Sequence, residues 1–135
     1  MSDQFNLEIV SPEKSFFKDN NVIEVIVPAF EGEMGILKDH ISIISFLKPG
    51  IIKVKINNDE RNFYVEDGIV EFKDNNLSIL TSNIFDIKKS DKLQISDMIK
   101  EAESDLADDK LDDQKRFLIS QKVEVLKSLN LNWIF

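Results

Sequence analysis

The sequence predicts an α+β protein in which an N-terminal antiparallel β-sandwich is followed by a C-terminal antiparallel two-helix hairpin. Three observations lead to this prediction. Apolar residues alternate with polar ones up to about residue 90, turn-forming residues interrupt the alternation at short intervals, and the apolar spacing then becomes helical. We therefore expect a β-sandwich domain over residues 1–90 and a helical hairpin domain over residues 91–135.

The expected strands have apolar residues at every second position, which buries one face of a strand and leaves the other in water. Short strands with frequent turns are typical of a sandwich or barrel. In chain order the alternating apolar sets are Phe5, Leu7 and Ile9; Ile23, Val25 and Val27; Ile52, Val54 and Ile56; Phe63 and Val65; Val70 and Phe72; and Leu77 and Ile79.

The segments between these sets carry residues that favour turns. Residues 19–21, 57–59 and 74–76 are rich in Asp and Asn, which tolerate a left-handed backbone. Pro49-Gly50 suits the two central positions of a type II turn. Gly68 and the Asp before it separate two apolar sets so closely that we expect a kink or bulge there rather than a hairpin.

Beyond residue 90 the apolar residues form two helical stripes. Ser96 is the expected N-cap of the first helix, and the Asp-rich residues 107–111 are expected to turn the chain toward the second. Two short helices bury little by themselves, so the hairpin packs on the sheet or on another protein, and both remain open. The stripes are Ile95, Met98, Ile99, Ala102 and Leu106, and then Ile119, Val123, Leu126 and Asn130.

Composition and charge exclude several classes of function. The formal net charge of -8 repels phosphate backbones, so we expect no nucleic-acid partner. The chain has no cysteine, and therefore no disulfide and no thiolate site. No apolar run approaches the length of a membrane span, and residues 1–4 do not resemble the start of a signal peptide. We expect no direct membrane insertion, so that any membrane association goes through a partner.

Patterns for catalysis and for metal binding are weak. The single histidine, His40, lies near Glu31, Glu33 and Asp39, and a metal site or an acid–base pair could be drawn from these residues. A solvated loop surface accounts for them without special chemistry. No glycine-rich phosphate loop and no nucleophilic serine motif is present. We expect no catalytic residue, no metal and no cofactor.

Two other functions stay open on the residues alone. A free-standing β-sandwich that binds a small ligand would have an apolar pocket with a few convergent polar groups. A small carboxylate-dependent hydrolase would hold two of the 25 acidic residues as a pair in a cleft.

The two expected helices carry opposite charge. One possibility is that the opposite charges hold the hairpin together, as an Asp112–Arg116 pair would help to do. The other is that the second helix offers a basic strip to an acidic partner. At the C-terminus Trp133 and Phe135 either dock on a partner or fold back over the hairpin. The acidic residues are Glu101, Glu103, Asp105, Asp108, Asp109, Asp112 and Asp113, and the basic ones are Lys115, Arg116, Lys122 and Lys127.

The stretch from Val27 to His40, which reads Val-Pro-Ala-Phe-Glu-Gly-Glu-Met-Gly-Ile-Leu-Lys-Asp-His, resembles the signature of ATP synthase epsilon subunits, the counterparts of the mitochondrial delta subunit. Further similarities occur in the family's order: the opening residues 7–13, the Leu-Lys-Pro-Gly of residues 47–50, Gly68, and residues 77–81. The resemblance covers residues 5 to about 90, and the hairpin matches by architecture only.

This resemblance implies a non-catalytic rotor subunit that couples proton flow to ATP synthesis. In the family one end of the sandwich is held against the polar loops of the membrane c-ring, and a side of the sandwich packs on the gamma subunit. The resemblance implies that Glu33 and His40 contact the ring with Glu31 nearby, and that Gly32 and Gly35 shape their loop.

In many relatives the hairpin extends along the shaft toward the catalytic beta subunits and inhibits ATP hydrolysis. The resemblance therefore makes the four basic residues of the second helix a candidate inhibitory strip. It also implies a peripheral location on the cytoplasmic side of a bacterial inner membrane, or the corresponding place in an organelle.

The chain departs from the family at two places. Lys38-Asp39 stands where the family often has Pro-Gly before the histidine, so we expect a less constrained turn. Some relatives bind ATP through an Asp and an Arg at the start of the first helix, where this chain has Ser96 and Ile99. A shift of one residue would place Asp97 on the Asp, with Lys100 in the neighbouring position. Neither Ile99 nor Lys100 replaces the planar fork of an arginine, so we expect ATP to bind weakly or not at all.

Overall fold

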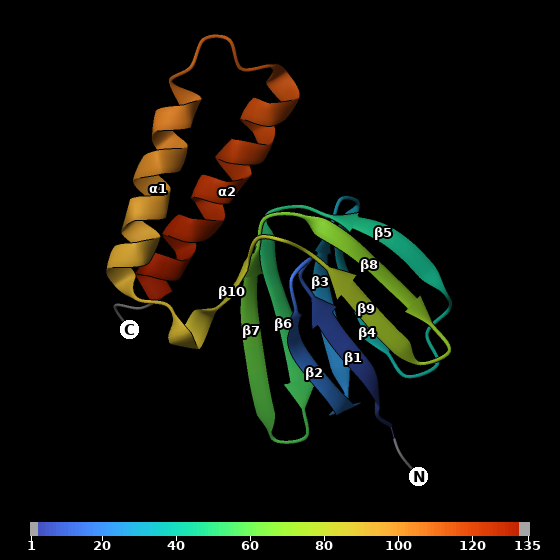
Figure 1. Ribbon diagram of the computed structural model, residues 1–135. Helices are drawn as coiled ribbons and strands as arrows, with labels where there is room; N and C mark the ends of the chain where they lie inside the picture. Colours follow the sequence, from blue (N-terminus) through green and yellow to red (C-terminus); the bar gives the residue numbers. More distant parts are fainter. Residues whose placement is uncertain (1–2, 133–135) are drawn as a thin grey trace. The chain divides into compact units, whose positions relative to one another are not determined.

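The computed structural model describes residues 3–132 (Figure 1). Trp133 and Phe135 lie outside the described residues. The chain divides into two compact units after Ile87. The elements are β1 (Phe5–Val10), β2 (Ser15–Val22), β3 (Glu24–Ala29), β4 (Gly32–Leu37), β5 (Ile43–Leu47), β6 (Gly50–Ile56), β7 (Asp59–Val65), β8 (Gly68–Lys73), β9 (Asn76–Leu80), β10 (Ile84–Asp86), a 3-10 helix (Ile87–Lys89), α1 (Lys92–Leu106) and α2 (Asp113–Asn132).

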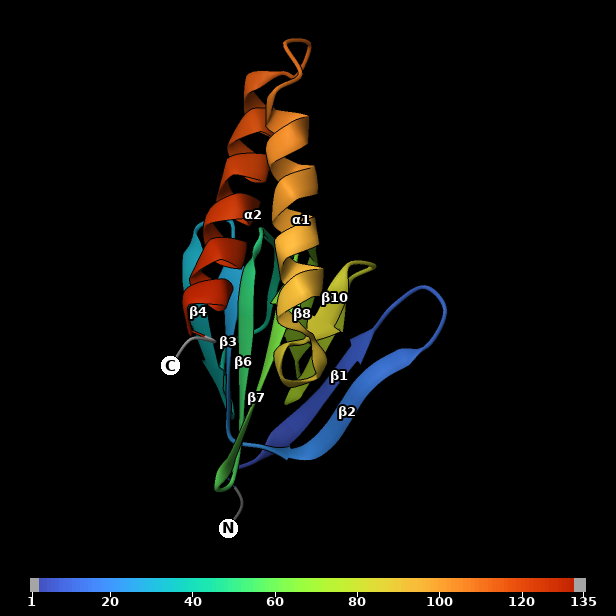
Figure 2. The same cartoon turned by 90° about the vertical axis from the view of Figure 1, so that its left-hand side faces the viewer.

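The strands form one hydrogen-bonded sheet that folds over into two layers (Figures 1 and 2). One layer holds β4, β3, β6, β7 and β10, and the other holds β5, β8, β9, β1 and β2. Only the pair of Ala29 with Leu47 joins β3 to β5, and the sheet folds over at this point. The predicted sandwich followed by two helices is confirmed. One pair departs from the antiparallel expectation, because β1 runs parallel to β9.

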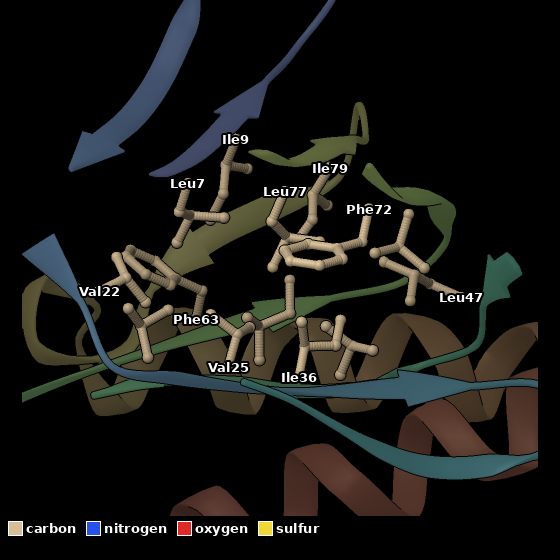
Figure 3. Packing of buried hydrophobic residues seen from close by; sticks show 14 of the residues in the cluster. Leu7, Ile9, Val22, Val25, Ile36, Leu47, Phe63, Phe72, Leu77 and Ile79 are labelled. Atoms are coloured by element: carbon tan, nitrogen blue, oxygen red, sulfur yellow. The ribbon is translucent and has the colours of Figure 1, made fainter. Parts of the chain in front are cut away.

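The inner faces of the two layers meet in one apolar core (Figure 3). The rings of Phe5 and Phe72 contact edge to face, with centroids 5.6 Å apart. Burying an apolar side chain of this size stabilises the fold by roughly 1.5–3 kcal/mol relative to leaving it exposed. The predicted inward faces are confirmed at Phe5, Leu7, Ile9, Val25, Val27, Ile52, Val54, Phe63, Val65, Val70, Phe72, Leu77 and Ile79, which the core contains. Ile56 is partly buried and packs against this core. The prediction for Ile23 is wrong, because it lies between β2 and β3 and is only partly buried, whereas Val22 before it is in the core.

The turn expected at residues 19–21 is wrong, because these residues lie inside β2. The pairing with β1 passes from Leu7 opposite Asp19 to Phe5 opposite Val22, so that β2 has one residue more than β1 between the two pairs. The backbone N–H two residues after Asp19 donates to its carboxylate at 2.7 Å. The side-chain chemistry that favours turns therefore closes a β-bulge here while the strand continues.

The Asp-Asn turn between β8 and β9 is confirmed. Asp74 and Asn75 have φ angles of 52° and 61°, and they join two residues that pair across the strands, Lys73 and Asn76. Two left-handed residues in a two-residue loop give the twist that neighbouring strands need. Asn57, in the turn between β6 and β7, is also left-handed with a φ of 48°.

The type II turn expected at Pro49-Gly50 is wrong. Gly50 begins β6 and lies outside the left-handed region that such a turn requires. Glycine is needed here for space, because a Cβ would lie 2.5 Å from the Cβ of Pro28.

The expectation that no hairpin forms at Gly68 is confirmed. β7 pairs with β6 and β10, whereas β8 pairs with β5 and β9, so the two residues before Gly68 carry the chain from one layer to the other. Gly68 has a φ of 153°, and a Cβ at this position would lie 2.6 Å from the carbonyl oxygen of Leu80. Both the backbone angle and the space therefore require glycine.

In the helical unit, α1 begins earlier than expected. Asp91, not Ser96, is the N-cap, and its carboxylate accepts the backbone N–H of Gln94 at 2.6 Å. Asp is as strong a cap as Ser, and Asp91 comes two residues after the end of the 3-10 helix, so the helix starts before Ser96 is reached. Of the predicted stripes, Ile95, Ile99 and Ala102 on α1 and Val123 and Leu126 on α2 are buried. Met98, Leu106 and Ile119 are partly exposed, and the side chain of Asn130 lies outside the described part of the chain.

Side chains of α2 close the turn between the helices. The guanidinium of Arg116 donates to the carbonyl oxygens of Leu106 at 2.7 Å and Asp108 at 2.9 Å. The carboxylate of Asp112 caps α2 by accepting the backbone N–H of Lys115 at 2.7 Å. Asp112 and Arg116, which the spacing would pair with each other, thus bind backbone groups that the helix ends leave unsatisfied.

Three glycine-to-alanine changes separate backbone strain from lack of space. Gly32→Ala should cost about 1–3 kcal/mol of unfolding free energy, because Gly32 has a φ of 133° but open space around it. Gly68→Ala should cost about 1–3 kcal/mol more, because a backbone oxygen blocks the added carbon. Gly35→Ala, with neither problem, is the control. Urea denaturation measures all three, and equal losses at Gly32 and Gly68 would contradict the steric argument.

Candidate functional site

The segment expected to be one glycine-containing loop is a strand between two turns. A two-residue turn, Phe30-Glu31, joins β3 to β4, and the second turn follows β4 at residues 38–40. Gly32 lies at the first turn with a positive φ. Gly35 lies inside β4, opposite Ile26, and its φ is not left-handed. The expected loop around Gly35 is therefore wrong, because the alternation that buries Ile36 continues through it.

The first turn is anchored to β5. The hydroxyl of Ser45 donates to the carboxylate of Glu31 at 3.1 Å, and the N–H of Phe30 donates to the carbonyl oxygen of Phe46 at 3.0 Å. Glu33 is exposed on the outer face of β4.

The second turn holds the histidine. The N–H of His40 donates to the carbonyl oxygen of Leu37 at 3.1 Å, and Asp39 takes a left-handed φ of 66°. The imidazole meets the ring of Phe72 edge to face at 6.0 Å, and its Nδ1 lies 2.7 Å from the carbonyl oxygen of Ile41.

The structure does not bring Glu31, Glu33 and His40 together. Strand β4 separates the two turns, and at about 3.3 Å per residue the four steps from Glu33 to Leu37 alone span roughly 13 Å. Glu31 precedes β4 and bonds to Ser45 on β5, whereas His40 follows β4 and lies at the opposite end of the sandwich. Among the described strands β4 pairs only with β3, so Glu33 and the histidine turn lie along one edge of the sheet.

A large apolar surface, which the sequence reasoning missed, covers the outer face of β5, β8 and β9. Phe46 is opposite Ile69, and Ile69 is opposite Leu80, so the three side chains form a row across the strands. Ile44 lies on the same face, two residues before Phe46. The backbone N–H of Phe30 donates to the carbonyl oxygen of Phe46, which places Phe30 next to Phe46. All five side chains are exposed, Phe46 to 61% and Ile44 to 70%. We call Phe30, Ile44, Phe46, Ile69 and Leu80 the outer apolar patch.

The sequence did carry a signal for this patch. Residues 43–47 read Ile-Ile-Ser-Phe-Leu, with apolar residues on both faces of the strand. A strand that is apolar on both faces is typically covered on both. The core covers Leu47 and the inner face, whereas in the described chain the outer face stays open to solvent.

The four basic residues of α2 do not form one row. At 100° per residue Lys115 and Lys122 share one side of the helix, and Arg116 and Lys127 share another, about a third of a turn away. Arg116 closes the interhelical turn, and Lys127 lies 3.4 Å from the carboxylate of Glu103 on α1. Exposed ion pairs of this kind contribute at most about 1 kcal/mol.

Among the described residues we find no arrangement typical of a catalytic or metal-binding site. No group of three or more His, Asp and Glu side chains in this part of the chain is placed to hold a metal ion. Burial raises the pKa of Tyr64, with help from the charge of Glu66, so that this phenol stays neutral. A groove of about 260 Å³ on β1, β2 and β9 is open to solvent, and its lining residues are Asn6, Leu7, Glu8, Lys18, Asn20, Asn76, Leu77 and Ser78.

Neither described helix is long and apolar enough to cross a membrane. The features that stand out are exposed surfaces: the outer apolar patch, the β4 edge with the histidine turn, and the basic residues of α2. Such surfaces suit contacts with other macromolecules better than binding of a small substrate.

Comparisons with known proteins agree with this view. A family model described as "ATP synthase, Delta/Epsilon chain, beta-sandwich domain" matches residues 4–87. An ATP synthase epsilon chain of Pelagibacter ubique is 62% identical over 130 residues, which are 96% of this chain and 100% of the relative. Another, of Parvibaculum lavamentivorans, is 32% identical over 96% of this chain and 97% of the relative.

Two solved structures share the fold. A chain in the Euglena gracilis mitochondrial ATP synthase structure, which comprises OSCP, F1 and c-ring, matches with a TM-score of 0.76 at 20% identity, over 98% of this chain and 83% of that chain. A chain in the central stalk and c-ring structure of the Tetrahymena thermophila enzyme matches with a TM-score of 0.63 at 14% identity, over 96% and 99%.

Proposed function

The chain belongs to the family of ATP synthase delta/epsilon chains, and we propose that it is a rotor subunit of the central stalk that links the gamma shaft to the membrane c-ring. In this role it couples proton flow to ATP synthesis by transmitting torque through packed surfaces. The observation that carries the proposal is the 62% identity to an epsilon chain along 96% of this sequence.

An epsilon chain is a structural and regulatory subunit and not a catalytic one, so this protein is not an enzyme in its own right. The family assignment replaces the two alternatives that the residues alone left open, the ligand-binding module and the carboxylate-dependent hydrolase.

The outer apolar patch is our candidate for the surface that packs on the gamma subunit. Exposed contiguous apolar surfaces mark contacts with other proteins, and aromatic residues contribute strongly to such contacts. Phe30 and Phe46 supply the aromatic residues, and the bond between Ser45 and Glu31 fixes the turn that carries Phe30. The other four residues, Ile44, Phe46, Ile69 and Leu80, lie on regular strands, which suits a contact that must stay rigid while it transmits torque.

The edge formed by β4 and the histidine turn is our candidate for the ring contact. Glu33 is exposed near one end of this edge, and His40 lies beyond the other. Polar and charged groups give such contacts their register. The contact therefore extends along an edge of the sheet and is wider than a single loop. Glu31, which bonds to β5, belongs to the gamma-facing side in this proposal.

The hairpin is our candidate inhibitory element, acting on the catalytic beta subunits. Arg116 bonds to the interhelical turn, and Lys127 pairs with Glu103 on α1. Both side chains give up these contacts, and can bind a partner instead, when α2 leaves α1. Lys115 is exposed on the other row. The acidic residues of α1 oppose the approach of an acidic surface, which favours contact through α2 after extension.

The location we propose is peripheral, on the cytoplasmic side of a bacterial inner membrane or the corresponding side in an organelle. The two relatives at 62% and 32% identity come from bacteria, which favours the first of these.

The double change Glu33→Ala, His40→Ala should weaken coupling in the reassembled ATP synthase while the sandwich stays folded. Surface changes of this kind usually alter stability by less than about 0.5 kcal/mol. Proton pumping per ATP hydrolysed is the measurement. Lys18→Ala with Asn20→Ala, two exposed positions on β2, is the matched control. Pumping efficiency equal to that of the control would remove the ring contact from this edge.

Phe46→Ala should weaken binding to the purified gamma subunit by about 2 kcal/mol, roughly thirtyfold, because central aromatic residues dominate interfaces. Phe117→Ala is the control, since Phe117 is exposed to 58% on α2, close to the 61% of Phe46. Titration calorimetry measures both variants. Equal affinities for gamma would show that the outer apolar patch is not its docking surface.

Truncation before residue 91 should raise ATP hydrolysis by the reassembled enzyme about fivefold or more, the low end of typical coupling between sites. Lys115→Ala with Lys122→Ala in the full chain tests whether the exposed row of α2 carries the effect. Hydrolysis that stays at the level of the intact chain after truncation would make the hairpin purely structural.

A further inference from the structure

The histidine turn and the β8–β9 hairpin turn, which are far apart in the sequence, are tied together by a pair of hydrogen bonds. The backbone N–H of Asp39 donates to the side-chain oxygen of Asn75 at 2.7 Å, and the side-chain amide of Asn75 donates to the carboxylate of Asp39 at 2.9 Å. The two residues are 36 positions apart. Both bonds use the side chain of Asn75, whereas Asp39 contributes its backbone N–H to one bond and its carboxylate to the other. Moving one turn relative to the other would therefore break both bonds.

Both residues hold the left-handed backbone that their turns require, with φ of 66° at Asp39 and 61° at Asn75. Asp and Asn reach this region at low cost, as glycine does, but unlike glycine they bring a side chain that can bond. The sequence predicts a loosely constrained turn at Lys38-Asp39. In the structure, the hydrogen bonds to Asn75 in the β8–β9 turn constrain this turn instead.

Asn75 also joins the N-terminal strand to this end of the sandwich. Its carbonyl oxygen accepts the backbone N–H of Asn6 at 3.0 Å, and the side chain of Asn6 donates to that of Asn76 at 2.8 Å. Two segments from different parts of the chain, the histidine turn and β1, therefore converge on the β8–β9 turn.

The histidine turn is the segment that this arrangement holds in place. His40 directly follows Asp39, and its ring lies against Phe72, which precedes the β8–β9 turn on the strand. Two exposed apolar residues, Leu37 at 53% and Ile41 at 76%, flank the turn. An exposed turn with so little buried surface of its own needs an external hold to keep one orientation.

We propose that Asp39 and Asn75 are positioning residues, whose paired hydrogen bonds fix the histidine turn in the orientation in which it meets the c-ring. The inference rests on the proposed ring contact. Preorganising the turn means that docking does not have to order it, which retains binding energy that a mobile turn would lose.

The test uses the full-length chain with variants chosen for their backbone. Asn75→Gly keeps the left-handed turn, because glycine adopts this conformation freely, but removes both side-chain bonds. Asn57→Gly is the matched control, since Asn57 is likewise left-handed and bonds to Gln4 instead of the histidine turn. Asn75→Asp puts two carboxylates together, and the double change Asp39→Asn, Asn75→Asp restores one donor and one acceptor.

Two measurements are made on each variant: amide hydrogen exchange at Asp39 with the NMR shift of the His40 ring, and proton pumping per ATP hydrolysed in the reassembled enzyme. Asn75→Gly and Asn75→Asp should speed exchange at Asp39 about tenfold or more, move the His40 signals and lower pumping efficiency. Asn57→Gly should leave all three unchanged, and the double change should return them toward the original values.

Unchanged exchange and His40 signals in Asn75→Gly would overturn the proposal, whatever the pumping efficiency. So would normal pumping in Asn75→Gly when His40→Ala, measured alongside, lowers it. If His40→Ala and Glu33→Ala also leave pumping intact, the ring contact itself is wrong, and the positioning role falls with it. Failure of the double change to restore the signals would show that the residues act separately, which also contradicts the pair.

Discussion

The apolar layer between the two halves of the folded sheet is the constraint on which the other features depend. Each strand must turn one face toward this layer, so the burial of Leu47 leaves Phe46 outside, and the burial of Ile36 leaves Glu33 outside. A shift of one residue in any strand would exchange these faces. The outer apolar patch and the β4 edge are therefore fixed by the same packing that stabilises the fold.

Asp and Asn residues stabilise bulges, turns and helix ends in both units of the chain. They close a β-bulge in β2, form the two-residue turn after β8, and cap both helices at Asp91 and Asp112. In the bulge and at the two caps a short side chain bonds to a backbone group that the regular element leaves unpaired, whereas Asp74 and Asn75 supply the left-handed backbone of the turn. The same chemistry acts at longer range between Asp39 and Asn75, where it joins two turns.

The surfaces that matter for function are positioned by strands and by turn-to-turn bonds, with no cleft among them. The outer apolar patch has the rigidity of three neighbouring strands, and the histidine turn has that of a hydrogen-bonded pair. The hairpin is a separate compact unit whose buried apolar residues include Ile95, Ile99 and Leu126, and Arg116 ties its turn through two backbone carbonyl groups. The ion pair between Lys127 and Glu103 is exposed and contributes little to closure. A unit with a small core of its own is suited to opening, whereas the sandwich is suited to transmitting force.

The sequence by itself determined the fold class, the inward faces of the strands, the helical stripes and the family, because alternation, helical spacing and an ordered set of motifs are local patterns. It did not determine whether Asp and Asn at residues 19–21 form a turn or a bulge, whether Gly35 lies in a loop or a strand, or which outward apolar residues gather across strands. Only the tertiary structure decided these, and it alone paired Asp39 with Asn75. Such features depend on which strands become neighbours, and strand pairing joins residues whose separation along the chain no local pattern records.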